Sequence, residues 1–115
     1  MSTPSIGGIS NEIGQTGNVG QLIYTVPSGS DQTIVVHVYM TLNPQGNPGI
    51  GVPSLAYTDE FGAQSYLLEH TGSSRLMGIS VPLRVKAGTT VTLNASPSGE
   101  TSWSVYTAVE VVSAT

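Results

Sequence analysis

Residues 32–42 alternate between two kinds of side chain in the manner of a long β-strand. One set of alternate positions is wholly apolar: Ile34, Val36, Val38, Met40 and Leu42. The positions between them mix polar and apolar side chains: Thr33, Val35, His37, Tyr39 and Thr41. Successive side chains of a strand point to opposite faces, and β-branched residues favour strands. The segment therefore predicts a strand with one face in a core, and it indicates that the chain has a β-fold.

Shorter segments of the same kind surround it, separated by turn sequences such as Pro27-Ser28-Gly29 and Lys86-Ala87-Gly88. We predict further strands at 22–26, 54–58, 63–69, 77–85, 89–94 and 101–112, and no segment supports a helix. Short strands with a turn about every 8–12 residues are typical of sandwiches and barrels. The prediction is an all-β fold, an antiparallel jelly-roll-type β-sandwich of seven to eight strands. An immunoglobulin-like strand order shares most of these signals and stays open.

Residues 1–20 are rich in Gly, Ser and Asn and follow neither a strand nor a helix period. We predict an extended N-terminal arm over 1–20 and a sandwich domain over 21–115. The alternative is a disordered terminus, which is common. Three isoleucines in a flexible terminus would be exposed to water unless another surface covered them. We therefore expect the arm to anchor the domain to a neighbouring subunit or larger assembly through Ile6, Ile9 and Ile13.

The chain of 115 residues carries few charges: 9% of its residues, against about 25% in a typical protein. Its net charge is −4 and its only basic residues are Arg75, Arg84 and Lys86. Nucleic acids and anionic membranes need clustered cations, so neither is an expected partner. A surface of hydroxyls and amides costs little to desolvate and suits extensive protein contact, although a Thr-rich β-protein has a similar composition.

Two of the predicted strands are apolar or aromatic on both faces. A strand in a small sandwich normally shows one face to water, so a second covered surface is expected. Aromatic residues are enriched at subunit interfaces, although strand propensity alone also favours Tyr and Val. We predict an oligomer interface formed by Val35, His37, Tyr39, Tyr106, Ala108 and Val112.

No motif points to catalysis. His37 and His70 lack the spacing of metal ligands, and the nucleophile pattern Gly-x-Ser-x-Gly is absent. Asp59 and Glu60 are neighbours in a hairpin connection, where they do not flank a substrate; calcium binding by these loop oxygens stays open, with a solvated turn as the simpler interpretation. We predict no catalytic residue, no cofactor and no metal. The first residues lack the features of a signal peptide, so we expect synthesis in a host cytoplasm.

The segment Tyr24-Thr25-Val26-Pro27-Ser28-Gly29, followed by a long strand, resembles the small jelly-roll domains of the tumour-necrosis-factor and complement-C1q type. The same resemblance is carried by residues 83–93, Leu-Arg-Val-Lys-Ala-Gly-Thr-Thr-Val-Thr-Leu, and the Val-rich last strand. The chain is similar in the same way to small bacteriophage virion proteins, such as head decoration (cement) proteins and fibre tips. The resemblance implies a homotrimer packed through one sheet. The chain lacks the cysteines of secreted members, which favours the virion version.

These observations together predict a structural virion protein, a decoration-type module that self-associates and binds a major capsid or other virion protein. The alternative is a carbohydrate- or receptor-binding tip domain of a phage fibre. Such a site would need polar loop residues next to an aromatic, and Asn43, Gln45, Asn47 and Asp59 are available.

Overall fold

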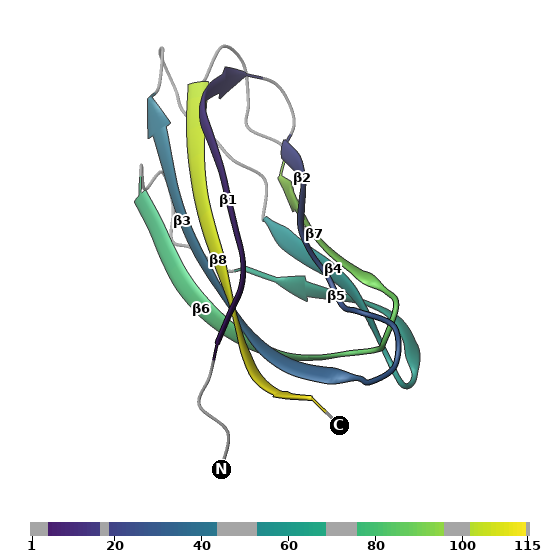
Figure 1. Cartoon of the computed structure of the whole chain (residues 1–115). Helices are drawn as coiled ribbons and strands as arrows, with labels where there is room; N and C mark the ends of the chain where they lie inside the picture. Colours follow the sequence, from purple (N-terminus) through teal and green to yellow (C-terminus); the bar gives the residue numbers. More distant parts are fainter. Residues whose placement is uncertain (1–4, 17–18, 44–52, 69–75, 96–101, 115) are drawn as a thin grey trace.

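The computed structural model describes residues 5–16, 19–43, 53–68, 76–95 and 102–114 (Figure 1). All eight elements are strands: β1 (Ser5–Thr16), β2 (Val19–Thr25), β3 (Gln32–Asn43), β4 (Ser54–Asp59), β5 (Gly62–Leu67), β6 (Leu76–Val85), β7 (Thr90–Ala95) and β8 (Ser102–Ala114). The all-β prediction is confirmed, and each predicted strand lies within a few residues of an observed one. The eighth strand, β1, comes from the N-terminal segment. No helix among the described residues is long and apolar enough to span a membrane.

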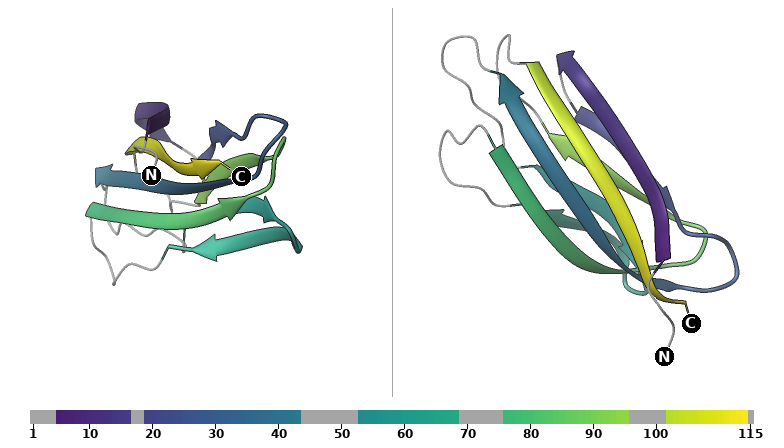
Figure 2. Two further views of the ribbon diagram at one scale, coloured as in Figure 1. Left: turned by 60° about the horizontal axis from the view of Figure 1, so that its bottom comes forward. Right: turned by 60° about the vertical axis from the view of Figure 1, so that its left-hand side comes forward.

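The strands form two antiparallel sheets of four that face each other (Figures 1 and 2). Sheet A has the order β1-β8-β3-β6, and sheet B has the order β2-β7-β4-β5. Four antiparallel pairs are nested within one another along the chain, namely β1 with β8, β2 with β7, β3 with β6 and β4 with β5. Nested pairs wound between two sheets give the jelly roll. An immunoglobulin-like order would keep the first two strands in one sheet, which the separation of β1 from β2 excludes.

The core lies between the sheets and is built from the alternation seen in the sequence. Ile34, Val36, Val38 and Met40 of β3 are all buried, as the strand's period predicts. The neighbouring strands of sheet A contribute Val81, Leu83 and Val85 from β6 and Val105 and Val109 from β8, and sheet B contributes Ile23, Leu55, Val91, Leu93 and Ala95. The inner faces of both sheets therefore cover each other. The predicted interface residues lie on the opposite, outer face of sheet A.

The segment predicted as an arm occupies a position within the sandwich. Ser5–Thr16 is extended, and as β1 it pairs along β8 at one edge of sheet A. The physical reason is that the edge of β8 presents unpaired backbone donors and acceptors, which an extended segment of the same chain satisfies. Whether this segment also anchors the domain to another assembly stays a prediction.

Turns at one end of the sandwich are fixed by backbone and side-chain hydrogen bonds. Gly88 adopts φ +76°, a conformation that glycine takes without strain, in the β6–β7 turn. Its N–H donates to the carbonyl of Val26 over 3.0 Å, and the N–H of Ala87 donates to Oδ1 of Asp31 over 2.9 Å. The β2–β3 and β6–β7 connections are therefore held together, which fixes the end of β3 relative to β6.

Candidate functional site

The six residues predicted as an interface lie on the outer face of sheet A, on adjacent strands β3 and β8. Tyr39 is directly opposite Tyr106, and His37 is opposite Ala108, in the antiparallel register. Val35 precedes them on β3 and Val112 follows them on β8. The strand order brings these residues together on one surface. The interface role of these residues stays a prediction.

An aromatic pair marks the centre of this face. The ring centroids of Tyr39 and Tyr106 lie 6.1 Å apart, with the ring planes tilted by 46°. This is within the range of favourable aromatic contacts. Both rings are nevertheless exposed, so the pair presents a platform of apolar surface to the solvent.

The aromatic pair borders a shallow, open hollow of about 470 Å³. Gly78 of β6 lies opposite Tyr39 and is one of the lining residues, and a Cβ added there would make an ordinary van der Waals contact of 3.7 Å with Tyr39 Cδ2. The outer-face residues that line the hollow are His37, Tyr39, Gly78, Ser80, Tyr106 and Ala108. The hollow is thus lined by aromatic, small and polar side chains together.

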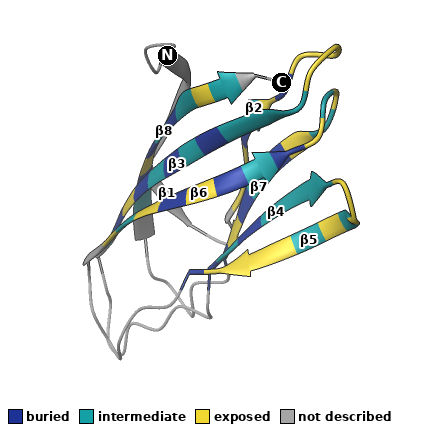
Figure 3. Cartoon of the chain, turned by 90° about the horizontal axis from the view of Figure 1, so that it is seen from below, coloured by how far each residue is buried: buried dark blue, intermediate teal, exposed yellow. Residues whose placement is uncertain are grey.

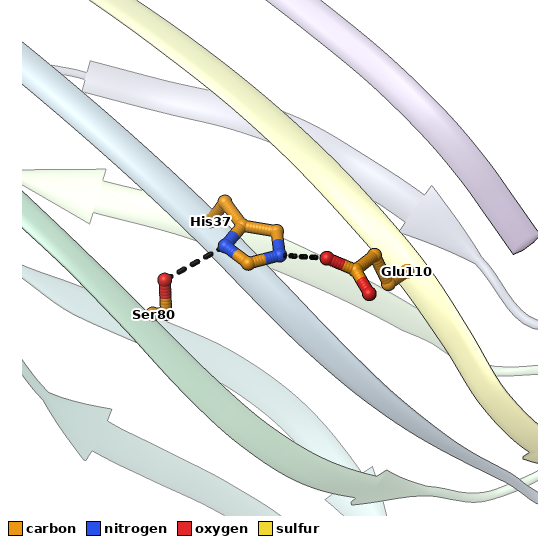
Figure 4. Close-up of polar contacts among 3 residues, drawn as sticks. All are labelled: His37, Ser80 and Glu110. Carbon is orange, nitrogen blue, oxygen red and sulfur yellow. Dashed lines mark hydrogen bonds and ion pairs between the residues drawn. The ribbon is translucent and has the colours of Figure 1, made fainter. Parts of the chain in front are cut away.

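Two of the lining residues, His37 and Ser80, belong to a three-residue network with Glu110 that runs across β6, β3 and β8 (Figure 4). His37 Nδ1 lies 2.7 Å from Ser80 Oγ, and His37 Nε2 lies 2.5 Å from Oε1 of Glu110. Both ring nitrogens of His37 are therefore engaged. The pair with Glu110 is an ion pair whenever His37 is protonated, and a hydrogen bond from Nε2–H in the neutral ring.

The network has the residue types of a hydrolytic triad, but its surroundings do not fit one. A serine nucleophile needs preorganised donors for the oxyanion that develops in the reaction, and no contact described at this site supplies one. What the structure shows is that the network satisfies the polar atoms of His37 with Ser80 on one side and Glu110 on the other.

Sequence reasoning placed His37 on this face but missed Ser80 and Glu110. Their position depends on β3 lying between β6 and β8, which the alternation of a single strand does not reveal. The sequence contained one indirect indication of their position. In each strand the residue alternates with the core-facing residues, which puts Ser80 and Glu110 on the outer face.

The acidic turn between β4 and β5 has a local structural role. Oδ1 of Asp59 accepts a hydrogen bond from the N–H of Phe61 over 2.8 Å and one from Gln64 Nε2 over 3.3 Å. Its charge also acts on Tyr57: burial, then the charge of Asp59, then Tyr66 raise the pKa of the Tyr57 phenol above its ordinary value. No group of three or more potential metal ligands occurs among the residues that the structure describes.

Several predicted residues lie outside this description. His70, Gln45 and Asn47 belong to segments 69–75 and 44–52, which are not described. For β1 the backbone register is known: Ile6 pairs with Glu110 and Ile9 with Ala108, while Ile13 falls in a register shift between Glu12 and Gln15. The anchoring role of these isoleucines stays a prediction.

Comparison with solved structures gives a structural likeness, and comparison with protein sequences gives none. No protein-family model and no curated protein sequence matches the chain. Among solved structures, the chain is similar to the crystal structure of the infectious bursal disease virus VP2 subviral particle, with 14% sequence identity and a TM-score of 0.46. The match covers 94% of this chain and 32% of that one, so the chain spans about a third of that protein's length. Identity and overlap of this size establish no family membership.

Proposed function

We propose that this chain is a structural virion protein, a decoration-type module that self-associates through the outer face of sheet A and binds a larger capsid assembly. The observation that carries the proposal is the exposed Tyr39–Tyr106 pair on the outer face of β3 and β8, two strands whose inner face is already buried in the core. Tyr39 is 46% exposed and Tyr106 is 39% exposed, and Val112 extends the same face. Removing apolar surface of this kind from water contributes about 25 cal/mol for each Å², before the entropic costs of association are subtracted.

The polar network makes this face suitable for burial. A buried polar group costs free energy unless it is hydrogen-bonded. His37 already has a partner at each ring nitrogen, Ser80 on one side and Glu110 on the other. A second subunit covering the network therefore needs to supply no partner for the imidazole ring.

The virion assignment and the threefold symmetry rest on the resemblance of residues 24–29 and 83–93 to small jelly-roll virion proteins. The low charge content agrees with this role, because a weakly hydrated surface is inexpensive to cover. The partners that fit are further copies of this chain and a major capsid or other virion protein. Symmetry would multiply several weak contacts to the capsid into tight attachment.

The self-association half is tested by placing a charge at the centre of the face. Tyr106→Lys should shift the sedimentation-equilibrium mass toward the monomer at micromolar concentration. The matched control is Asn94→Lys on β7, an exposed position of sheet B, which should leave the mass unchanged. Equal masses for the wild type and both variants would remove the proposed interface.

The virion half has its own test. An antibody raised against the folded domain should label intact virus particles from the culture that produces the protein. Labelling confined to material free of particles would contradict the virion role while leaving self-association in place.

A second candidate function, carbohydrate binding, is favoured by the hollow itself. It places an aromatic platform beside the hydroxyl of Ser80 and the imidazole of His37, a combination of apolar wall and few polar groups common in ligand sites. The same surface cannot be buried between subunits and bind a sugar at once. A monomeric chain that gives glycan-array signals abolished by Tyr39→Ala would favour this candidate over self-association.

A further inference from the structure

We propose that covering the outer face of sheet A binds one proton at the His37–Glu110 pair of each copy, so that self-association strengthens as the pH falls from about 8 to about 6. This regulation rests on the self-association proposed above and acts on the same surface. Four features of the structure carry it: the charge of the pair, its exposure in the single chain, the hydroxyl of Ser80, and the scarcity of cations around it.

The first feature is the charge that the pair carries. Glu110 Oε1 lies 2.5 Å from His37 Nε2, and the contact is an ion pair only when the imidazole is protonated. With a neutral imidazole and an ionised carboxyl, the pair has a charge of −1; with one further proton it has none. Because the two groups are in direct contact, that proton is bound by the pair as a unit. One proton therefore decides whether this part of the face is charged or neutral.

The second feature is that water reaches both side chains while the face is open. Figure 3 shows β3 alternating between buried and partly exposed residues, and His37 belongs to the partly exposed set. The His37 side chain is 38% exposed and the Glu110 side chain is 37% exposed. A second subunit would remove this water, and a charge that loses its solvation is costly unless an opposite charge compensates it. Covering the face therefore favours the pair that has bound the proton.

The pair lies within the surface that self-association would cover. His37 lines the hollow together with Tyr39 and Tyr106. On β8, Glu110 lies between Tyr106 and Val112, which are both exposed. A subunit that covers the two tyrosines and Val112 therefore also covers the carboxylate between them.

The third feature is that the network can bind the proton while every contact stays in place. His37 Nδ1 lies 2.7 Å from Ser80 Oγ (Figure 4). In the neutral ring, Nε2–H donates to Glu110 and Nδ1 accepts the hydroxyl hydrogen of Ser80. In the protonated ring both nitrogens donate, and the oxygen of Ser80 accepts, because a hydroxyl can take either role. Each ring nitrogen therefore keeps its partner in both states, and only the charge of the face changes.

The fourth feature is that cations are scarce around the pair. Arg84 is the only Lys or Arg in β3, β6 and β8, and its Nη1 donates to Thr33 Oγ1 over 3.1 Å. Thr33 precedes His37 by four residues, which is about 13 Å along the strand. The whole chain has three basic residues against seven acidic ones, so a second copy is a poor source of a compensating cation. A proton from solution compensates the carboxylate instead.

The other titratable groups around His37 do not account for the same pH dependence. Glu110 is the only acidic residue of β3, β6 and β8. The other titratable side chains on this face are Tyr39 and Tyr106, and phenols are uncharged between about pH 6 and 8. Glu12 of β1 is in register with Val105, a core position of β8. The His37–Glu110 pair is thus the group on the described face that gains a proton in this range.

Sedimentation equilibrium of the full chain at about pH 8, 7 and 6 and constant ionic strength tests the regulation. For the wild type, the association constant should rise as the pH falls, by up to about tenfold per pH unit for each proton bound. In Glu110→Gln the network is neutral when the imidazole is neutral and carries a charge of +1 when it is protonated. The association constant of this variant should therefore fall as the pH falls.

Two controls separate this reversal from a general effect of charge. The net charge of −4 becomes less negative in acid, which would strengthen the association of wild type and Glu110→Gln alike. Glu60→Gln makes the same substitution at an exposed position between β4 and β5 and should keep the wild-type direction. His70→Gln removes the only other histidine of the chain and should also keep it.

The outcomes distinguish this regulation from the self-association on which it rests. An oligomer whose association constant is independent of pH, or decreases as the pH falls, overturns the regulation and leaves self-association in place. The same direction in wild type and Glu110→Gln overturns it as well. A monomer at every pH contradicts the self-association itself, and the regulation with it.

Discussion

Oε1 of Glu110 lies 2.5 Å from Nε2 of His37, although the two residues are 73 positions apart in the chain. The contact is diagonal, because His37 is directly opposite Ala108 and Glu110 is opposite Val35. It joins the two central strands of sheet A in the middle of the proposed interface. It therefore offers a way to alter the interface without altering the core.

Glu110→Ala should weaken self-association more than Glu110→Gln does. The alanine leaves the Nε2 side of His37 without its partner when the face is covered, at a cost of about 1–3 kcal/mol, roughly 5- to 150-fold in affinity. The glutamine keeps an acceptor for the imidazole N–H. Sedimentation equilibrium of both variants measures the difference, and equal affinities would mean that the network is not covered in the oligomer.

The buried core should respond to truncation far more than the surface does. Leu93→Ala on β7 removes a fully buried side chain and should lower the free energy of unfolding by about 2–5 kcal/mol. Leu22→Ala on β2 is the matched control, since Leu22 is exposed, and it should change stability by less than about 0.5 kcal/mol. Urea unfolding at low protein concentration compares the two. Similar midpoints would contradict the described packing of sheet B.

The β4–β5 turn should depend on its glycine. Gly62→Ala places a Cβ on a backbone at φ +116° and should cost about 1–3 kcal/mol through strain. Gly20→Ala meets open space without such a φ and should be tolerated. Thermal unfolding distinguishes them. A Gly62→Ala variant as stable as Gly20→Ala would mean that the turn adopts another conformation.

Alkaline conditions should destabilise the fold partly through Tyr57. Burial, with the charges of Asp59 and Tyr66, raises its pKa in the folded state above the ordinary 10.0. The folded state therefore favours the neutral phenol, and the stabilisation present below about pH 10 is lost as the pH rises through the folded-state pKa. Tyr57→Phe should lose less stability than the wild type above pH 10, in urea unfolding at several pH values. Parallel losses in both proteins would exclude this contribution.

The sequence was sufficient for most of the fold because its strands carry their own periodicity. The alternation in 32–42 predicted which residues of β3 face the core, and the burial of Val36 and Val38 agrees with it. β1 was predicted as an arm and not as a strand of the sandwich. The reason is that its register with β8 shifts twice, between Ile6 and Gly8 and between Glu12 and Gln15. Each shift interrupts the two-residue period that identifies a strand.

The candidate site could be predicted only in part. The outer-face residues of β3 and β8 follow from the same alternation as the core. The contacts of His37 with Ser80 and Glu110 require knowledge of which strands flank β3, and that order arises from the nesting of the whole chain. The pattern of a single strand does not show which strands pair with it. The contacts of His37 with Ser80 and Glu110 therefore follow only from the folded structure.

The central claim is that this chain covers the outer face of sheet A with further copies of itself. Multi-angle light scattering of the unaltered protein at micromolar concentration tests it most directly. The account predicts a mass that is a multiple of 11.9 kDa, three times that value for the trimer. A mass of 11.9 kDa at every concentration, with Tyr39 and Tyr106 accessible to solvent, would contradict it.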